Sequence, residues 1–230
     1  MSALFITATG TDIGKTYVAA GLIAALRRSG RKVTALKPVL SGFDTQNFAA
    51  SDPAALLAAC GQTPTLEAIA QISPWRFAAP LSPDQAAARE GRTVDIAEVR
   101  RFCADATASA EDVVIIEGIG GLMVPLDAKH TICDLISALD VPLLLVAGTY
   151  LGSLSHTLTA IEVATKRELK IAGLVLNETP GATVSIAATR ESLGHFWRGP
   201  LVALRHEAIV PQGLGATNAA AFEKLAEILP

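Results

Sequence analysis

Residues 7–16 of this 230-residue chain are TATGTDIGKT, and this stretch decides the fold. It ends in Gly14-Lys15-Thr16, the residues that close a phosphate-binding loop, between an apolar run at 3–8 and a helical run at 15–28. At the start of such a helix, unpaired backbone N–H groups bind phosphate oxygens. The strict pattern GxxxxGK[ST] requires glycine at position 9, where this chain has threonine, so the tripeptide alone is a weak signal. Its place between a strand and a helix favours a phosphate site over an exposed lysine after a turn.

Two residues of this loop indicate how a nucleotide would be held. Lys15 can reach the β- and γ-phosphates, and the Thr16 hydroxyl can bind Mg²⁺. Mg²⁺ takes one or two carboxylates besides the phosphates. Glu117 is one candidate, because a carboxylate after four apolar strand residues needs a partner. Asp52 is the other, although it can equally cap the helix that starts there, and the residues alone leave both interpretations open.

A second lysine is expected in the same crevice. Lys37 lies near the carboxyl end of the second predicted strand, and Pro38 interrupts that strand and turns the chain outward. Ligands of open parallel sheets bind beyond the carboxyl ends of the strands. Lys37 is therefore predicted to project toward the phosphate loop; the alternative is a side chain that extends to solvent.

The rest of the chain alternates apolar with helical runs, which predicts an α/β fold with a doubly wound, mostly parallel sheet and helices on both faces. The apolar runs are nearly continuous in Val, Ile and Leu, as in strands buried on both faces. Strands are predicted at 3–8, 32–39, 112–118, 142–148, 171–177 and 200–204. Helices are predicted at 15–28, 95–108, 131–139, 153–169, 182–193 and 217–228, and one more follows Ser82 as N-cap, with Pro83 in its first turn and Gly91 as its end.

The chain is predicted to form a single domain over residues 1–230. The longest interruption in the alternation, at 40–111, is helical and punctuated by prolines, and no Gly/Ser linker or change in composition marks a second domain. We expect this segment to be an insertion that lines the site. Half of the residues are hydrophobic, which suits a large core.

Charge and composition argue against several classes of partner. The net charge is −3 without a long run of Lys or Arg, which disfavours nucleic acid and anionic membranes. The longest apolar stretch is far shorter than the ~20 residues of a membrane span, and no signal-peptide pattern is present. The three cysteines show neither a disulfide framework nor a zinc-ligand spacing. A cytoplasmic protein is expected.

These motifs resemble those of the dethiobiotin synthetase family over nearly the whole chain, which implies a P-loop NTPase-like fold. The family's longer phosphate loop, GTDTxVGKT, aligns with residues 8–16, with matches at Thr9, Thr11 and the final GKT. Asp12 stands where the family often has Glu, and Ala8 stands where it has Gly, which is tolerated only if φ is negative. Further similar segments follow in the family's order: KPVLSG at 37–42, SD at 51–52, FAAPLSP at 77–83, EGR at 90–92, EGIGGLMVPL at 117–126, GTYLGSLSHTLT at 148–159 and GLVLNE at 173–178.

Two segments depart from the family pattern. Many members carry a Pro-Trp pair after the last core strand, where this chain has ALRHEA at 203–208, so adenine contacts from that loop are not carried over. Some members also cover the substrate tail with an aromatic residue on the helix after the Asn motif, and residues 186–189 here contain none.

The resemblance implies an ATP- and Mg²⁺-dependent enzyme of biotin biosynthesis that joins CO2 to 7,8-diaminopelargonic acid. One amine takes up CO2, the resulting carbamate attacks the γ-phosphate, and the second amine closes the ureido ring and releases phosphate. The protein must hold two anions together and neutralise their charge, which requires positioning and electrostatic stabilisation.

The roles of the family's residues carry over to the matching positions. Lys37 and Lys15 would bridge the carbamate and the γ-phosphate, while Thr11 and Ser41 would orient the carbamate. Asn177 would contact adenine. The metal ligands would be Thr16, Asp52 and Glu117, which favours the ligand role of Asp52. Nucleotide binding is implied for Asp12, Ile13, Gly14, Lys15, Thr16, Tyr17, Asp52, Glu117, Gly118, Ile119, Gly120, Asn177 and Glu178. Substrate binding is implied for Thr11, Lys37, Ser41, Leu151, Gly152 and Ser153.

A homodimer is also implied by the resemblance. Leu151, Gly152 and Ser153 open a predicted helix whose N-terminus would bind the distal carboxylate of the substrate. In the family this contact crosses the dimer interface. His156 on the same helix is expected to pack near that interface rather than to act as a general base.

Two other functions share a phosphate loop of this kind. A switch ATPase of the deviant-Walker class carries KGGxGKT, but the position of its signature lysine is Gly10 here. An amide synthetase of the cobyrinate type normally needs a glutaminase domain, for which this chain is too short. Dethiobiotin synthesis is therefore the favoured hypothesis.

Overall fold

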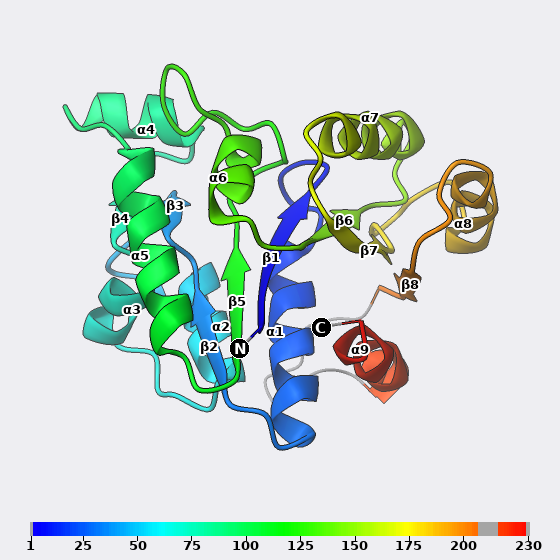
Figure 1. Ribbon diagram of the computed structural model, residues 1–230, viewed down its shortest axis with the longest axis horizontal. Coiled ribbons are helices and arrows are strands. Elements are labelled where there is room, and N and C mark those ends of the chain that lie inside the picture. Colours follow the sequence, from blue (N-terminus) through cyan, green and yellow to red (C-terminus); the bar gives the residue numbers. More distant parts are fainter. Residues whose placement is uncertain (1, 207–215, 229–230) are drawn as a thin grey trace.

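A six-stranded parallel sheet forms the centre of the computed structural model, which describes residues 2–206 and 216–228 (Figure 1). The strands are ordered β2-β5-β1-β6-β7-β8, and each neighbouring pair is parallel. The strands are β1 (Ser2–Ala8), β2 (Val33–Leu36), β5 (Val113–Glu117), β6 (Leu143–Ala147), β7 (Ile171–Asn177) and β8 (Leu201–Leu204). Because β2 and β5 lie on one side of β1 and β6 to β8 lie on the other, the loop after β1 opens where the strand order reverses. The predicted α/β class and doubly wound sheet are confirmed.

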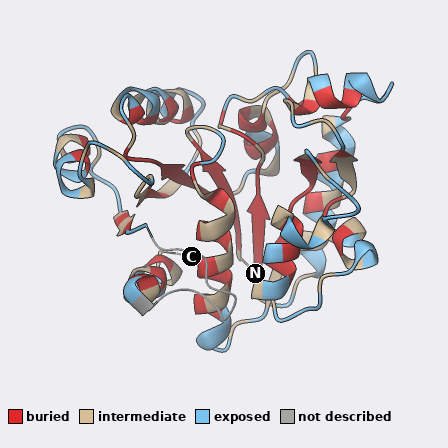
Figure 2. Cartoon of the chain, turned by 180° about the vertical axis from the view of Figure 1, so that it is seen from behind, coloured by how far each residue is buried: buried red, intermediate tan, exposed pale blue. Residues whose placement is uncertain are grey.

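Helices cover both faces of this sheet, and the strands between them are buried (Figure 2). In β1, Phe5 packs on one face, while Leu4 and Ile6 pack on the other. The first face is covered by α5 (Ile96–Ser109), α6 (Ile132–Leu139) and α7 (Ser153–Lys166). The second face is covered by α1 (Lys15–Arg28), α2 (Asp52–Ala59) and α9 (Ala219–Ala226). Burial on both faces accounts for the continuous apolar runs.

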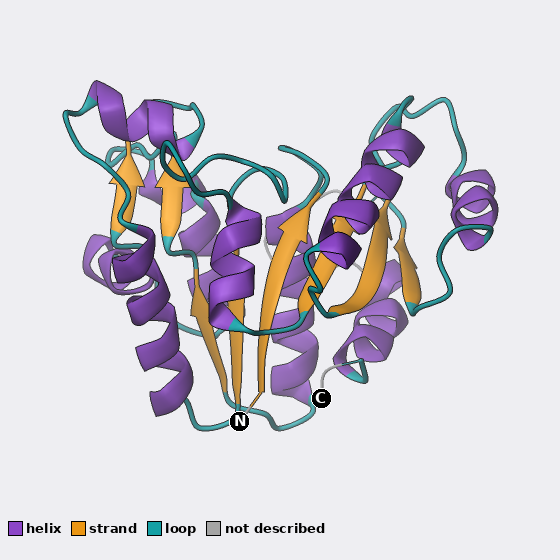
Figure 3. Ribbon diagram, turned by 45° about the horizontal axis from the view of Figure 1, so that its top comes forward, coloured by secondary structure: helices purple, strands orange, loops and turns teal. Residues whose placement is uncertain are grey.

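The prediction of one continuous strand at 32–39 is wrong, because the structure has two separate strands in this region. The strand β2 ends before Lys37, and β3 (Val39–Ser41) begins after Pro38 and pairs in parallel with β4 (Trp75–Phe77) in a separate two-stranded sheet (Figure 3). Pro38 has no N–H to continue the first ladder, so the chain changes sheets there. The strand β4 was not predicted, since three residues are too few for a periodic signal.

The segment predicted as an insertion supplies most of the small sheet and two helices that cover the main sheet, α2 and α5. Besides α2, β4 and α5, it contains the 3₁₀ helix η1 (Phe48–Ala50), α3 (Leu66–Ile72) and α4 (Pro83–Arg89). Helix α5 packs against β5 and α6, so this part of 40–111 belongs to the main sheet. Its role as an insertion and the single domain over 1–230 stay predictions.

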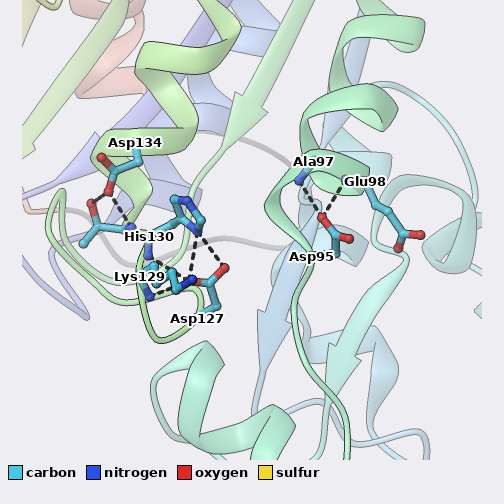
Figure 4. Close-up of polar contacts among 8 residues, drawn as sticks. Asp95, Ala97, Glu98, Asp127, Lys129, His130 and Asp134 are labelled. Atoms are coloured by element: carbon cyan, nitrogen blue, oxygen red, sulfur yellow. Dashed lines mark hydrogen bonds and ion pairs between the residues drawn. The ribbon is translucent and has the colours of Figure 1, made fainter.

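Helix starts follow the capping residues. The predicted α1 is confirmed at both ends, and α4 begins after Ser82 as predicted. Helices α5 and α6 begin one residue later than predicted because Asp95 and Thr131 are their N-caps. The Asp95 carboxylate accepts hydrogen bonds from the N–H groups of Ala97 and Glu98 (Figure 4). These caps satisfy N–H groups that have no partner within the helix.

Three helices toward the carboxyl end are shorter than predicted. Helix α7 ends at Lys166 rather than 169, and Glu168 adopts a left-handed φ of 55°. Helix α8 (Ile186–Gly194) begins after the N-cap Ser185 rather than at 182. The run predicted at 217–228 is the 3₁₀ helix η2 (Ala216–Asn218) followed by α9. None of the helices in the described residues is long and apolar enough to cross a membrane.

Candidate active site

The loop between β1 and α1 presents backbone N–H groups to the crevice. Gly14 is the N-cap of α1 with φ 92°, and no side chain caps the helix. The first N–H groups of α1 are therefore available to an anion. Asp12 also has a left-handed φ, of 57°. Ala8 lies within β1 and is not among the described residues with positive φ, so the predicted negative φ is confirmed.

Asn177, at the end of β7, fastens this loop to the sheet. Its Nδ2 donates a hydrogen bond to the carbonyl oxygen of Ile13 at 2.9 Å. A Cβ added to Gly14 would overlap that same amide nitrogen. The side chain of Ile13 is buried in the core beneath α1. The loop is thus held in place by the packing of the Ile13 side chain in the core and by the hydrogen bond from Asn177.

Lys15 is buried against the loop that it follows. The alternative of an exposed lysine after a turn is therefore wrong. Nζ of Lys15 donates to the carbonyl oxygen of Gly10 at 3.1 Å. Burial, and secondly the nearby Lys37 ammonium, lower the pKa of Lys15 to about 8. An anion beside Lys15 would favour its charged form.

Lys37 lies at the centre of a buried ionic cluster, only 1 % exposed. Its Nζ is 2.6 Å from Glu117 Oε1 and 2.9 Å from Asp52 Oδ2, and it donates to the carbonyl oxygen of Gly118 at 2.9 Å. The solvent-exposed alternative for Lys37 is therefore wrong. Asp52 is the first residue of α2 and Ser51 is its N-cap, so the capping alternative for Asp52 is also wrong.

The charges of this cluster depend on one another. Burial disfavours the ammonium, but the Glu117 and Asp52 carboxylates outweigh burial and raise the pKa of Lys37. Burial likewise opposes the charge on Asp52, yet Lys37 holds the pKa of Asp52 below its usual value. Burial raises the pKa of Glu117, which leaves the Lys37 ammonium and the Thr16 hydroxyl to stabilise its charged form.

The same cluster has the donors that a magnesium ion requires. Thr16 Oγ1 donates to Glu117 Oε1 at 2.8 Å. The second carboxylate oxygen of Glu117 is buried and has no hydrogen-bond partner, which is costly unless a further partner binds it. The described residues hold no group of three or more His, Cys, Asp or Glu suited to a metal. Two carboxylates and one hydroxyl fit Mg²⁺, which takes its remaining ligands from phosphates and water.

These residues line one cleft of 930 Å³ at the carboxyl ends of β1, β2 and β5. It brings together most of the predicted nucleotide and substrate residues: Thr11, Asp12, Gly14, Lys15, Thr16, Tyr17, Lys37, Ser41, Asp52, Glu117, Ile119 and Gly120. The buried hydroxyl of Ser41 has no hydrogen-bond partner, so it can bind a ligand group. Leu40, Gly42 and the Pro80–Pro83 stretch also line the cleft. They lie within the KPVLSG and FAAPLSP segments, but none of them was assigned to the site from the sequence.

A second cavity of 450 Å³ adjoins the first, and Thr11 and Val124 line both. Its wall includes Met123 and the α7 residue His156, whose Nδ1 lies 2.7 Å from the Tyr150 hydroxyl. Leu151, Gly152 and Ser153 line neither cavity, and Leu151 is 85 % exposed. Within one chain the predicted carboxylate-binding residues are therefore apart from the cleft.

Two predicted nucleotide residues that do not line the cleft have structural partners. Glu178 accepts a hydrogen bond from the N–H of His206 at 3.0 Å and thereby holds the end of β8. Gly118 lies against the Phe5 ring, where an added Cβ would come within 2.8 Å. Residues 207 and 208 of the departing ALRHEA segment lie outside the described residues.

One residue next to the site had no sequence signal. Asn218 is buried, donates to the Tyr17 hydroxyl at 2.8 Å, and exchanges two hydrogen bonds with the Arg205 backbone. It joins the start of α1, the end of β8 and the start of α9. A lone asparagine before a helix predicts a cap, and only the fold brings its distant partners together.

The chain is similar in sequence to known proteins over most of its length. A family model described as an AAA domain matches residues 2–213. The chain is 49 % identical over 198 residues to the ATP-dependent dethiobiotin synthetase BioD of Methylobacterium nodulans, covering 84 % of this chain and 88 % of that protein. It is 47 % identical to the protein of the same name from Acidiphilium cryptum, covering 84 % and 87 %.

Solved structures with lower identity share the fold. The Pyrococcus furiosus cell division ATPase MinD matches with a TM-score of 0.58 and 19 % identity over 99 % of this chain and 98 % of that one. Chloroplast FtsY from Physcomitrella patens matches with a TM-score of 0.55 and 16 % identity over 98 % of this chain and 65 % of that one. These similarities concern the fold alone.

Proposed function

Because this chain belongs to the dethiobiotin synthetase family, we propose that it uses ATP to join CO2 to 7,8-diaminopelargonic acid, giving dethiobiotin, ADP and phosphate. The observation that carries the proposal is the meeting of two lysines with two carboxylates beside a phosphate loop. Lys15 and Lys37 line the same cleft as Asp52 and Glu117. This arrangement suits a reaction between two anions, a carbamate and a γ-phosphate.

The first task of the site is to hold the triphosphate. The N–H groups that open α1 bind phosphate oxygens, and Lys15 supplies a positive charge beside them. Thr16, Asp52 and Glu117 would hold Mg²⁺, which would screen the phosphate charge when bound. The buried, unpartnered Glu117 Oε2 supports this assignment.

The second task is to hold the carbamate against the γ-phosphate. Thr11 and Ser41 line the cleft, and the Ser41 hydroxyl is unpartnered, so both can orient the carbamate oxygens. The Lys37 ammonium stabilises negative charge on the attacking oxygen. That oxygen bonds to phosphorus while ADP leaves, and the second amine then displaces phosphate from the carbonyl carbon, losing its proton as the ring closes.

Recognition of the base is assigned to Asn177. Its Nδ2 donates to the carbonyl oxygen of Ile13. Because a carbonyl oxygen can only accept, this contact fixes which amide atom is the nitrogen, and Oδ1 is left as an acceptor. An acceptor there favours the 6-amino group of adenine over a keto oxygen. We predict that ITP, which has a 6-keto group, binds about tenfold or more weakly than ATP. Competition binding checks this, and the Asn177→Ala variant should lose the difference; equal affinity for ITP and ATP in the unaltered protein would contradict the assignment.

Affinity for ATP should fall in mild alkali. With a pKa of about 8, lowered from 10.5, Lys15 of the free protein loses its proton as pH rises through 8. Bound phosphates hold that proton, so the nucleotide dissociation constant rises above pH 8 while the complex stays protonated to higher pH. Calorimetric titration at pH 7 and pH 9 measures this. A dissociation constant that stays the same across this range would show that Lys15 is not the group that titrates.

A homodimer would complete the substrate site. Leu151, Gly152 and Ser153 are apart from the cleft of their own chain, so a second copy would have to present this helix start to the distal carboxylate of the substrate. The exposed Leu151 and the half-exposed Met123 beside the second cavity supply apolar surface for such a contact.

The reaction is tested with the purified protein, 7,8-diaminopelargonic acid, bicarbonate, Mg²⁺ and ATP. We expect mass spectrometry to detect dethiobiotin in amounts equal to the phosphate released. Omitting the diamine should abolish phosphate release. Diamine-independent ATP turnover without ring product would instead favour a switch ATPase, the alternative that Gly10 argues against.

A further inference from the structure

Asn218 stands where a residue normally caps a helix, but its side chain bonds elsewhere. It is the N-cap of α9 and only 2 % exposed, and its side chain makes no capping hydrogen bond. Oδ1 instead accepts from the N–H of Arg205 at 3.0 Å, and Nδ2 donates to the Arg205 carbonyl oxygen and to the Tyr17 hydroxyl, both at 2.8 Å. The amide oxygen and both amide N–H groups are therefore engaged. The side chain holds two other elements in place rather than the start of its own helix.

Helix α9, which Asn218 precedes, packs directly against α1 (Figure 1). The Phe222 ring of α9 and the Tyr17 ring of α1 meet in a T-shaped arrangement, with 5.6 Å between their centroids. A Cβ added to Gly21 of α1 would come within 2.1 Å of the Phe222 ring, so α9 lies against the backbone of α1. The position of Asn218 is therefore set by α1, the helix that begins at the phosphate loop.

From Arg205 the contacts continue to the residue assigned to the base. His206, next to Arg205, donates its N–H to Glu178 Oε2 at 3.0 Å. Glu178 follows Asn177 at the end of β7, and Asn177 donates to the Ile13 carbonyl oxygen in the phosphate loop. The contacts thus form a closed path from α1 through α9, β8 and β7 back to the phosphate loop.

We propose that Asn218 is a positioning residue of the ATP site: by holding the Tyr17 hydroxyl and the Arg205 backbone, it fixes the phosphate-binding start of α1 relative to the base-binding end of β7. The inference rests on the ATP site and on the base recognition by Asn177 proposed above. Asn218 does not line the nucleotide cleft, whereas Tyr17 does. A ligand that spans both ends of the site, as ATP does, gains affinity from this preorganisation, and a ligand that occupies only the phosphate end does not.

Calorimetric titration with the Mg²⁺ complexes of ATP and of inorganic tripolyphosphate separates these two kinds of ligand. Tripolyphosphate has a chain of three phosphates and lacks the base and ribose. Asn218→Ala should weaken ATP binding about fivefold or more and leave the affinity for tripolyphosphate within about twofold of the original. A general loss of stability would not distinguish the two ligands. Equal losses for both, or no loss of ATP affinity, would overturn the proposal.

Asn47→Ala is the matched control. Asn47 also precedes a helix, the 3₁₀ helix η1, without a capping hydrogen bond from its side chain, but it is exposed. This variant should bind both ligands as the unaltered protein does.

A second variant keeps the test independent of whether Asn218→Ala folds. Tyr17→Phe removes the hydroxyl that Asn218 binds and keeps the ring beside Phe222, and it should also weaken ATP binding more than tripolyphosphate binding. Its effect should be smaller in the Asn218→Ala background, because the two side chains act through one hydrogen bond. Unchanged ATP affinity in Tyr17→Phe, or losses that are fully additive in the double variant, would overturn the proposal.

Asn177→Ala separates this inference from the base recognition on which it rests. If Asn177→Ala loses the preference for ATP over tripolyphosphate and Asn218→Ala keeps it, the inference alone is wrong. If the unaltered protein has no such preference, or Asn177→Ala keeps it in full, the proposed base recognition and the inference are both wrong.

Discussion

Replacing Lys37 by alanine should lower the rate of dethiobiotin formation by about 10³-fold or more, since it removes a positive charge that the proposed reaction uses to stabilise the reacting anions. The structure adds a cost in stability. Glu117 is fully buried, and breaking a buried ion pair by removing one partner destabilises a protein by about 3–5 kcal/mol. Single-turnover assays below the melting transition, with circular dichroism of the same samples, separate the two effects.

Lys32→Ala is the matched control for this variant. Lys32 is an exposed lysine paired with an exposed carboxylate, so it shares the charge of Lys37 but not its burial or its place in the cleft. It should leave both rate and stability close to those of the unaltered protein. Near-normal turnover in folded Lys37→Ala would remove Lys37 from the chemical step.

Replacing Gly14 by alanine should weaken ATP binding by about 100-fold or more. The φ of 92° is strained for any side chain, and the new Cβ would overlap the amide of Asn177. The loop must therefore shift, which moves the N–H groups of α1 away from the phosphates. Calorimetric or fluorescence titration with ATP measures the loss.

Gly10→Ala in the same loop is the control. A Cβ at Gly10 would meet only the Ile13 side chain, at an ordinary distance of 3.8 Å, and Gly10 does not line the nucleotide cleft. Its ATP affinity should stay within about threefold of the original. If Gly14→Ala binds ATP as well as Gly10→Ala does, the loop conformation described here is not the one that binds nucleotide.

The sequence predicted the fold well where local and tertiary signals agree. The buried strands of the main sheet have continuous apolar runs, and α1 has both a loop glycine before it and Gly30 with a φ of 86° after it. The strand at 32–39 was misjudged because Lys37-Pro38 interrupts an otherwise apolar run. The small sheet of β3 and β4 depends on a pairing between residues far apart in the chain, which no local pattern encodes.

The candidate site shows the same division. The phosphate loop, Lys37, Asp52 and Glu117 were identified from motifs, and the structure brings them into one cleft. What motifs could not give is their bonding: Lys37 pairs with Asp52 and Glu117, and the Asn177 amide nitrogen donates to the Ile13 carbonyl oxygen. The Asn218 bridge between α1 and β8 was missed because its partners are distant in sequence.

The path of one oxygen atom tests the central claim most directly. If a carbamate made from CO2 attacks the γ-phosphate, one of its two oxygens leaves with phosphate when the ring closes, and the other stays in the ureido carbonyl. With ¹⁸O-labelled CO2 and short reaction times, mass spectrometry should find one labelled oxygen in phosphate for each dethiobiotin formed. Phosphate without label would show that water, not a carbamate, attacks ATP in this cleft, and would contradict the account.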